Sequence, residues 1–541
     1  MRRAGCVVAK LPIVPSRHTP WDRMVYLSQE CSMAAQITGA FFIGSRQVQS
    51  ADRFYAINPA TAEKIEPGFS VSSENDVAQA CALAGSVFDT YRATSSDQRA
   101  HFLEAIADNI VALGDVAIAR AQCETALPAP RLTGEITRTA NQLRLFASEL
   151  RDGRWQGLRI DPAQPDRKPL PRPELRLRKI PLGPVAVFGA SNFPFAFSVA
   201  GGDTAAALAA GCPVVVKAHP AHPGTSELVA TAIIAAIKAC ALPEGVFSMV
   251  AGPGNALGAA LVANPHIKAV GFTGSRQGGL ALMEIAARRA EPIPVYAEMS
   301  SINPVILLPH ALEQRAEVLA AAFLNSLTMG VGQFCTNPGL LIALESPALE
   351  RFIRASAEGL PKTTAAPMLT PGIFANYTSG VARLQSDPHT KAVGAGAKSE
   401  DPNCGQAFLF SVTAADFLAS PRLAQEVFGP SSVLVRCTSR QQLHAVLEAL
   451  EGQLTATLQL DEADHALARD LLPVLERKAG RILTNGWPTG VEVAHAMVHG
   501  GPFPATSDGR STSVGTLAID RYLRPVCYQD LPPGLLPLGL H

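Results

Sequence analysis

Cys335 is the residue of this chain whose chemical potential is easiest to recognise. It stands in the segment Gly-Gln-Phe-Cys-Thr at 332–336, inside a glycine-punctuated turn and downstream of Glu298. A thiol in such a turn can be presented to a ligand, and its thiolate form attacks carbonyl carbons. Free cysteines are equally often inert, buried small hydrophobic residues. The cysteine alone therefore leaves a nucleophilic and a structural role open.

A glycine-rich turn at 271–279 is the second such feature. It reads Gly-Phe-Thr-Gly-Ser-Arg-Gln-Gly-Gly and lies between an expected strand and an expected helix. Such a turn directs backbone N–H groups and the positive end of a helix towards a phosphate. The Gly-x-Gly-x-x-Gly fingerprint is absent after the first strand, where residues 189–194 read Gly-Ala-Ser-Asn-Phe-Pro. The turn fits a nucleotide site, although similar turns occur in proteins that bind none.

The hydrophobic pattern predicts the elements that position these residues. Apolar residues recur at helical spacing over 73–150, and a proline-rich connector follows at 161–173. The alternation Leu-Arg-Leu-Arg at 175–178 predicts a half-exposed strand, which we place at a sheet edge because charges commonly protect edges. Alternating elements follow, with expected strands at 185–188, 214–216, 247–250 and 269–272 and expected helices at 195–210, 225–239, 256–262 and 280–287. A second α/β segment begins at 304–308 and runs to about residue 500, so we expect parallel sheets covered by helices.

Composition excludes several classes of protein. The 541 residues are too many for one ordinary core. The 46 basic and 46 acidic residues give no excess charge for a nucleic-acid partner, and no apolar stretch approaches the ~20 residues of a membrane helix. The ten cysteines form neither a CxxC pair nor a zinc-like cluster, which is typical of a cytoplasmic protein without a metal site. Residues 1–32 are expected to be a non-native or disordered extension, with Met33 as the physiological start.

Six segments in this order resemble the aldehyde dehydrogenase superfamily. They are Ser-Asn-Phe-Pro at 191–194, Lys217, Gly-Phe-Thr-Gly-Ser at 271–275, Glu298, Gly-Gln-Phe-Cys at 332–335 and Glu-Val-Phe-Gly-Pro at 426–430. The resemblance extends from about residue 39 to the C-terminus. It implies an α/β fold with a Rossmann-like parallel-sheet cofactor domain, a second α/β catalytic domain and a small strand-based oligomerisation element.

The resemblance also implies domain boundaries. The dinucleotide-binding domain would take residues 33–160 and 181–298, and the catalytic domain residues 299–503. Segments 161–180 and 504–541 would bridge subunits, with a strand near 522–528 of the kind that family members exchange. A homodimer or homotetramer is therefore expected.

The family mechanism assigns roles to three residues. Cys335 would attack the aldehyde to form a thiohemiacetal, while the side-chain amide of Asn192 and the Cys335 backbone N–H stabilise the oxyanion. After hydride transfer to a nicotinamide, a thioester would remain on Cys335. Glu298 would then act as the general base for the water that releases the acid.

The implied cofactor residues come from several segments. Glu426 and Phe428 would hold the nicotinamide end, Lys217 would reach the adenosine ribose, and the helix-opening turn would supply Gly274, Ser275 and Gly279. Members that prefer NAD usually carry Lys-Pro-x-Glu, whereas Pro220 stands here in place of the acid. The loss of that carboxylate favours NADP without excluding NAD. His219, His222 and Thr225 are candidate helpers, although each is equally well explained as a residue at the entry of a helix.

The substrate is predicted from a narrower resemblance. The segments at 219–224 and 485–502 resemble the branch of 2-oxoglutarate semialdehyde (2,5-dioxopentanoate) dehydrogenases and NADP-dependent fatty aldehyde dehydrogenases. A carboxylate-bearing aldehyde would need a cation, so the candidates are Arg138, Gln142 and Arg144, with Phe334 and Trp487 as apolar walls. His495 and His499 are each candidates for proton handling or for a structural role.

Other functions make different demands on the sequence. A fatty aldehyde enzyme would need an apolar tunnel, and a CoA-acylating enzyme would generally lack Glu298. A catalytically idle binding or structural protein would be expected to lack at least one of Cys335, Asn192 and Glu298, yet all three are present. A cysteine hydrolase would need a histidine base near the nucleophile but no dinucleotide turn, so cofactor binding alone would exclude it.

Overall fold

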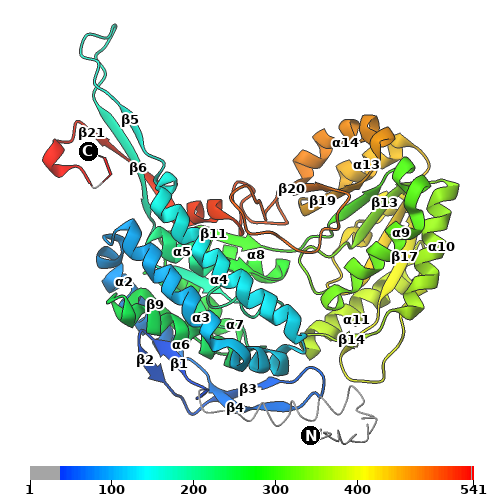
Figure 1. The fold of residues 1–541 in the computed structure, drawn as a ribbon, viewed down its shortest axis with the longest axis horizontal. Coiled ribbons are helices and arrows are strands. Elements are labelled where there is room, and N and C mark those ends of the chain that lie inside the picture. The colour runs from blue at the N-terminus through cyan, green and yellow to red at the C-terminus, as the bar shows by residue number, and fades with distance from the viewer. Residues whose placement is uncertain (1–36, 538, 541) are drawn as a thin grey trace, which may run out of the picture.

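A computed structural model describes residues 37–537 and 539–540 of the chain. This part forms two α/β lobes, each built on a seven-stranded sheet, and a thin arm extends from the first lobe (Figure 1). The expectation for residues 1–32 falls outside the described residues. No helix in the described ranges is both long and apolar enough to cross a membrane.

The first lobe contains the sheet that the 184–298 pattern predicts. Its order is β11-β10-β7-β8-β9-β1-β2; β11 through β9 run parallel, and β1 pairs antiparallel with β9 and β2. The strands are β1 (Phe41–Ile43), β2 (Arg46–Val48), β7 (Val185–Phe188), β8 (Val214–Lys217), β9 (Phe247–Val250), β10 (Ala269–Thr273) and β11 (Val295–Glu298).

Helices cover both faces of this sheet because its central strands are apolar on both sides. Val185 and Val187 pack with α3 to α6, whereas Ala186 packs on the opposite face with α2, α7 and α8. The helices are α2 (Glu74–Arg92), α3 (Ser96–Thr125), α4 (Ala129–Asp152), α5 (Gly202–Ala210), α6 (Pro223–Ala239), α7 (Asn255–Ala263) and α8 (Arg276–Ala287).

The helix expected at 195–210 begins later than predicted. Its helical part is α5, which starts at Gly202, and residues 195–201 form turns. The backbone N–H groups of Phe195 and Ala196 donate to the side chain of Glu135 on α4. Because this carboxylate lies far away in sequence, local periodicity cannot reveal the turns.

The second lobe repeats the architecture with a different strand order, β15-β17-β18-β13-β12-β19-β20. All neighbours are parallel except β15, which pairs antiparallel with β17. The strands are β12 (Pro304–Leu307), β13 (Leu340–Leu344), β15 (Lys391–Ala395), β17 (Phe408–Thr413), β18 (Ser431–Cys437), β19 (Gln453–Gln459) and β20 (Ala479–Thr484). The helices are α9 (Pro309–Thr328), α10 (Pro347–Gly359), α11 (Pro371–Ser386), α12 (Ala414–Ala419), α13 (Arg440–Ala449) and α14 (His465–Lys478).

The placement of the 175–178 strand at an edge was wrong. Strand β6 (Leu175–Pro181) is the middle strand of a three-stranded antiparallel sheet, between β5 (Arg159–Asp161) and β21 (Leu523–Gln529). This sheet forms the projecting arm (Figure 1). Its side chains are half-exposed on both faces, which accounts for the charged pattern without an edge position.

Two small antiparallel sheets complete the strand inventory of the described residues. Strands β3 (Arg53–Ile57) and β4 (Lys64–Ser70) form one, and β14 (Ala366–Pro367) and β16 (Cys404–Gly405) form the other.

The chain crosses back to the first lobe after β20. The predicted second α/β segment therefore ends at Thr484 in its regular elements, earlier than expected. Thr506 forms a β-bridge with Glu298, and a 3₁₀-helix over Thr516–Tyr522 follows before β21. The returning segment, orange-brown to red between the lobes in Figure 1, carries His499 to the end of β11.

Candidate active site

The carboxyl ends of the parallel strands in the first lobe carry the expected site residues. Asn192 follows β7, Lys217 ends β8, Gly274 follows β10 and Glu298 ends β11. Carboxyl ends of parallel strands share one edge of the sheet, which is where open α/β sheets bind their ligands. The topology thus gathers residues that lie more than a hundred positions apart in sequence.

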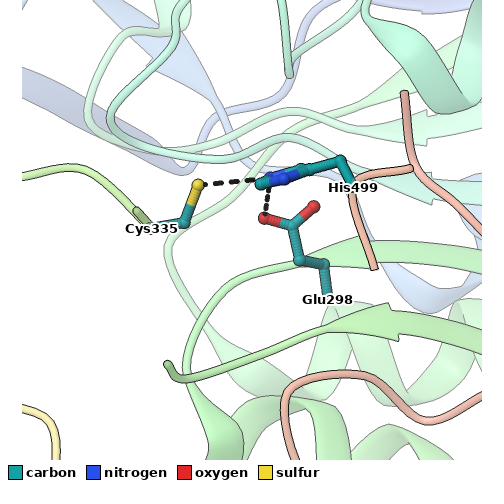
Figure 2. A group of neighbouring side chains, drawn as sticks. All are labelled: Glu298, Cys335 and His499. Carbon is teal, nitrogen blue, oxygen red and sulfur yellow. Dashed lines mark hydrogen bonds and ion pairs between the residues drawn. The ribbon is translucent and has the colours of Figure 1, made fainter. Parts of the chain in front are cut away.

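Three side chains from three different segments converge at this edge (Figure 2). The Sγ atom of Cys335 lies 3.4 Å from Nε2 of His499, and the same Nε2 lies 2.9 Å from Oε1 of Glu298. His499 and Glu298 are fully buried, whereas Cys335 is half-exposed. The second oxygen of Glu298 accepts a hydrogen bond of 2.6 Å from the hydroxyl of Ser513. One ring nitrogen is therefore within reach of both the nucleophile and the carboxylate.

The electrostatics of the cluster give its two acids opposite states. Burial, reinforced by the Glu298 charge, raises the pKa of the Cys335 thiol well above its ordinary value. Burial would also raise the pKa of Glu298, but the charge and hydrogen bond of His499 and the hydroxyl of Ser513 outweigh it and hold that pKa below its ordinary value. The resting site consequently pairs a neutral thiol with an ionised carboxylate, and the thiol needs a base.

Asn192 lies beside the nucleophile turn, as the family resemblance implied. Its side chain is buried, and Nδ2 donates a 3.0 Å hydrogen bond to the carbonyl oxygen of Gln333, two residues before Cys335. A side-chain amide has two N–H donors, so the second remains for an oxyanion.

An arginine that the sequence did not single out joins the two catalytic loops. The guanidinium carbon of Arg131, on α4, lies 4.7 Å from the ring centre of Phe193 and 4.7 Å from that of Phe334. Its Nη2 donates a 2.9 Å hydrogen bond to the carbonyl oxygen of Asn192. Phe193 follows Asn192 and Phe334 precedes Cys335, so this contact fixes both loops relative to α4.

Two sets of contacts hold the turn that carries Cys335. Nδ2 of Asn303 donates to the carbonyl oxygens of Cys335, at 2.8 Å, and Asn337, at 2.9 Å. Gly332 has a φ of +65°, and a Cβ there would lie 2.4 Å from the nitrogen of Pro430. Only glycine allows this turn to touch the Glu-Val-Phe-Gly-Pro motif so closely.

The glycine-rich turn has the close packing of a phosphate loop. Ser275 caps α8 by accepting a 3.1 Å hydrogen bond from the backbone N–H three residues later. A Cβ at Gly274 would lie 2.7 Å from the ring of Phe272, and one at Gly279 would lie 2.6 Å from the sulfur of Met299. The turn thus brings bare backbone to the start of α8, which fits the phosphates of a dinucleotide.

Lys217 ends β8, and His219 lies two residues later. Burial lowers the pKa of Lys217 to about 8. Burial, then the positive charges of His222 and Lys217, lowers the pKa of His219 well below its ordinary value. His219 is consequently neutral at physiological pH, which leaves Lys217 as the cation of this pair.

The other two candidate helpers for NADP are occupied. His222 is fully buried, and its Nε2 lies 2.8 Å from the carbonyl oxygen of Ala190. The hydroxyl of Thr225 donates to the buried carboxylate of Glu124 at 2.8 Å. Both side chains therefore hold the loop and the start of α6, contrary to the cofactor role considered for them.

Glu426 and Phe428 lie opposite, on the second lobe. Glu426 contributes to a pocket of about 770 Å³ that Ser300, Arg276 and the end of α13 also line, within the range of ~300–1,000 Å³ usual for ligand sites. Burial raises the pKa of Glu426 to about 7, despite hydrogen bonds from Ser300 and Ser301. A carboxylate short of donors beside a pocket is suited to accept ribose hydroxyls, so these residues fit the nicotinamide end of the cofactor.

The ring of Phe197 lies between Arg138 and His499 of the Cys335–His499–Glu298 cluster. The guanidinium carbon of Arg138 is 5.2 Å from the ring centre of Phe197, which lies 6.3 Å from the ring centre of His499. Nη2 donates to the carbonyl oxygen of Val491 at 3.2 Å, while Nη1 is buried without a partner among the described residues. Gln142, one turn later on α4, is buried, and its Nε2 likewise has no partner in that part of the chain.

Arg144 takes a different position from the other two candidates. It is exposed and donates a 2.7 Å hydrogen bond to Asp108 of α3. Six positions after Arg138, it points about 120° around the helix from it. The structure does not bring Arg144 together with Arg138, and its role as a substrate ligand is not supported by this geometry.

The two residues predicted to form apolar walls of the substrate site lie in different places. Phe334 is buried against Phe193, with ring centres 5.5 Å apart, directly before Cys335. Trp487 instead packs on Phe323 of α9, with ring centres 5.7 Å apart, in the core of the second lobe.

The two histidines of the C-terminal segment separate clearly. His499 is the central member of the catalytic cluster. His495 is exposed, with Nδ1 3.5 Å from Glu149 and 3.3 Å from the hydroxyl of Thr516.

The fold and the site fit the class of enzymes that oxidise aldehydes. The aldehyde dehydrogenase family profile matches residues 46–518. The chain belongs to the aldehyde dehydrogenase family, whose members use NAD or NADP.

Two relatives are similar over nearly the whole chain. The chain is 59% identical to alpha-ketoglutaric semialdehyde dehydrogenase 2 of Azospirillum brasilense, over 93% of this chain and 97% of that protein. It is 49% identical to alpha-ketoglutaric semialdehyde dehydrogenase of Acinetobacter baylyi, over 92% and 94%.

Solved structures share the fold. Aldehyde dehydrogenase C from Pseudomonas syringae, in complex with NAD⁺ and octanal, superposes with a TM-score of 0.78 at 22% identity, over 92% of this chain and 98% of that one. Betaine aldehyde dehydrogenase from Staphylococcus aureus, in complex with NAD⁺, gives 0.80 at 18% identity, over 95% and 99%.

Proposed function

We propose that this protein oxidises 2-oxoglutarate (alpha-ketoglutaric) semialdehyde to 2-oxoglutarate with NADP⁺ as the preferred cofactor. The observation that carries the chemistry is the convergence of Cys335, His499 and Glu298 beside Asn192. The substrate rests on the names of the two relatives that are 59% and 49% identical.

The first step is activation of the thiol. Because Nε2–H of His499 donates to the ionised Glu298 carboxylate 2.9 Å away, this nitrogen is not free to accept a proton. Glu298, which also has a side-chain hydrogen bond with Cys335, takes the thiol proton, and Nε2–H of His499, 3.4 Å from Sγ, stabilises the thiolate. The thiolate attacks the aldehyde carbon and forms a thiohemiacetal.

Asn192 stabilises the oxyanion that this attack creates. Its free amide hydrogen and the Cys335 backbone N–H are the donors, and one such donor contributes about 10²–10³ in rate. Arg131 fixes Asn192 relative to Cys335 through the two phenylalanine rings.

A bound nicotinamide cofactor would supply the hydride acceptor that the conversion of the thiohemiacetal to a thioester requires. Glu426 and Phe428 would hold its nicotinamide end, and Lys217 with the turn at 274–279 would hold its adenosine and phosphate end. Glu298 then removes a proton from the attacking water, and the carboxylic acid leaves Cys335 as a free thiol.

Arg138 and Gln142 recognise the distant carboxylate of the substrate. Their unpartnered buried N–H groups lie on one face of α4, one ring away from the cluster. A guanidinium N–H group that is buried without a hydrogen-bond partner gains from an anionic ligand. Phe334 and Phe197 would enclose the carbon chain between the two ends.

NADP preference follows from the missing carboxylate at Pro220, which would otherwise repel a 2′-phosphate. Lys217 supplies the positive charge, and the neutral His219 supplies at most a hydrogen bond. With one cation at this site, we expect a moderate preference and measurable turnover with NAD⁺.

The test compares kcat/KM for 2-oxoglutarate semialdehyde, succinate semialdehyde and hexanal with each cofactor. The oxo-acid aldehyde with NADP⁺ should give the highest value. Arg138→Met should lower kcat/KM at least tenfold for the two aldehydes that carry a carboxylate. The value of kcat/KM for hexanal should stay within about twofold. The matched control Arg144→Met, on the same helix, should change neither.

Preference for hexanal would favour the second candidate, a medium- or long-chain aliphatic aldehyde dehydrogenase. The observation that supports this second candidate is the presence of apolar rings beside the cluster, those of Phe193, Phe197 and Phe334. Cofactor binding without turnover of any aldehyde would instead indicate an idle scaffold.

Assembly and location also remain proposals. We expect the arm formed by β5, β6 and β21 to bridge subunits in a homodimer or homotetramer, which light scattering would test. A cytoplasmic location is expected for the same enzyme.

A further inference from the structure

We propose that Cys335, His499 and Glu298 also form a three-ligand site for Zn²⁺, and that its occupation reversibly inhibits the enzyme. The inference concerns regulation of the site described above. Its effect on turnover rests on the proposed function, whereas metal binding itself rests only on the geometry of the three side chains.

The donor atoms are the types that zinc prefers. The cluster offers a thiolate sulfur, an imidazole nitrogen and a carboxylate oxygen, and all three lie within 4.8 Å of one another. Three protein ligands with an open fourth position are the usual composition of zinc sites that bind an exchangeable ligand. No other group of three or more His, Cys, Asp and Glu side chains meets this criterion in residues 37–537.

The distances are close to those that tetrahedral zinc requires. Zn–S and Zn–N bonds of about 2.3 and 2.0–2.1 Å place sulfur and nitrogen about 3.5 Å apart, and nitrogen and oxygen about 3.4 Å apart. The Cys335–His499 separation is 3.4 Å, and the His499–Glu298 separation is 2.9 Å. Opening the second pair by about half an ångström is a shift within side-chain freedom.

The charges balance when the metal binds. The Cys335 thiol loses its proton to solvent, the S–H bond is replaced by a Zn–S bond, and His499 and Glu298 each provide a lone pair. The thiolate and the carboxylate together neutralise Zn²⁺, and no group is oxidised or reduced. The sulfur that attacks the aldehyde is then committed to the metal.

The hydrogen bonds that the zinc ligands make to other groups indicate how tightly Zn²⁺ would bind. Ser513 holds the second Glu298 oxygen, which orients one ligand. Nδ1 of His499, however, has no partner among the described residues, whereas strong zinc sites fix that nitrogen with a carboxylate or carbonyl. We therefore expect micromolar affinity, consistent with a reversible inhibitor and not with a resident cofactor.

The first experiment uses Co²⁺ as a spectroscopic substitute for Zn²⁺. Titration of the full-length, metal-free enzyme should produce a thiolate-to-cobalt charge-transfer band and tetrahedral d–d bands, saturating at one equivalent per chain. Zn²⁺ should abolish these bands by displacement. The same Zn²⁺ concentrations should inhibit aldehyde oxidation, and EDTA should restore it.

Variants locate the site. Cys335→Ser should lose the charge-transfer band, and His499→Gln should weaken Co²⁺ binding at least about tenfold. Cys527→Ser removes an exposed free cysteine outside the cluster and should keep the spectrum and the inhibition. Thermal unfolding confirms that each variant is folded. If His499→Gln unfolds, Zn²⁺ protection of Cys335 against iodoacetamide in the unmodified enzyme replaces it.

A charge-transfer band that persists in Cys335→Ser, or no Co²⁺ binding at the stated stoichiometry, would overturn the proposal. The spectroscopic readout needs no substrate. An enzyme that binds Co²⁺ through Cys335 but turns over no aldehyde would refute the proposed function alone, and an active enzyme without the band would refute only the metal site.

Discussion

Two carboxylates, one on each lobe, are placed in contrasting surroundings. Glu298 ends β11 of the first lobe, is fully buried and has a pKa below its ordinary value. Glu426 precedes β18 of the second lobe, is half-buried and has a pKa raised to about 7. The more buried acid is thus the more strongly ionised one. Hydrogen-bond and charge partners, and not burial alone, decide the state of each group.

The difference matches the two proposed tasks. Glu298 keeps its partners His499 and Ser513 in the resting protein and is ready to move protons. Glu426 lacks comparable partners, and ribose hydroxyls would complete its hydrogen bonds when the cofactor binds. Four substitutions test this difference between the two carboxylates, and the one with the largest expected effect comes first.

Glu298→Gln should have the largest effect. Loss of the general base should lower kcat by about 10²–10⁴, because the release of the acid is slowed more than acylation, which hydroxide can also start by deprotonating Cys335. Stopped-flow absorbance should then show a burst of reduced cofactor of up to one equivalent per chain. Glu313→Gln, an exposed acid on α9, should behave like the unmodified enzyme. A linear trace at the normal rate would show that Glu298 is not required for hydrolysis.

His499→Gln should follow, with kcat/KM reduced about 100-fold near neutral pH. The reason is that the Cys335 thiol, with its raised pKa, would lose the Nε2–H that stabilises its thiolate. Activity should rise with pH more steeply than in the unmodified enzyme, because the thiolate would then form only at higher pH. An unchanged pH profile would contradict this role of His499.

Glu426→Gln should have a moderate effect on the cofactor alone. In the unmodified enzyme, KM for NADP⁺ should rise as the pH falls through about 7, because protonation removes the charge that accepts the ribose hydroxyls. The variant should show KM raised about tenfold at pH 8 and no such pH dependence. Glu451→Gln, at the same pocket but exposed and paired with Arg276, is the matched control. A pH dependence retained in Glu426→Gln would assign it to another group.

Glu135→Gln should have the smallest catalytic effect of the four. This third buried carboxylate accepts two backbone N–H bonds beside Asn192 and contacts no reacting atom. The amide keeps one acceptor, so we expect a loss of about 1–3 kcal/mol in the free energy of unfolding and a small change in kcat. Urea unfolding followed by fluorescence measures the first quantity. A loss of kcat as large as that of Glu298→Gln would mean that Glu135 does more than hold the loop.

Much of the fold could be predicted because the signals are local. Strands β7 to β10 and helices α2, α3, α6 and α7 lie where hydrophobic periodicity placed them. The strand β6 was recognised but misplaced within its sheet, because its neighbours β5 and β21 are separated from each other by more than 350 residues. The start of α5 was also misjudged, since a distant carboxylate holds the preceding turns.

The proposed site residues divide in the same way. The resemblance of short segments to the aldehyde dehydrogenase family indicated Cys335, Asn192, Glu298 and Glu426. Arg131, Asn303 and Ser513 were missed because a single Arg, Asn or Ser carries no local signal, and each acts through contacts across the sequence. His499 was one of two histidine candidates, which only its contact with Cys335 distinguished from His495.

The sequence by itself determined the type of fold and the family and made Cys335 the predicted nucleophile, because turn chemistry, periodicity and short motifs are properties of neighbouring residues. Only the tertiary structure decided the state of those residues. The ionisation of Glu298, the neutral thiol of Cys335 and the choice of His499 depend on burial and on partners from three separate segments. Electrostatic energies depend on distance in space and on exclusion of water, and the folded chain sets both.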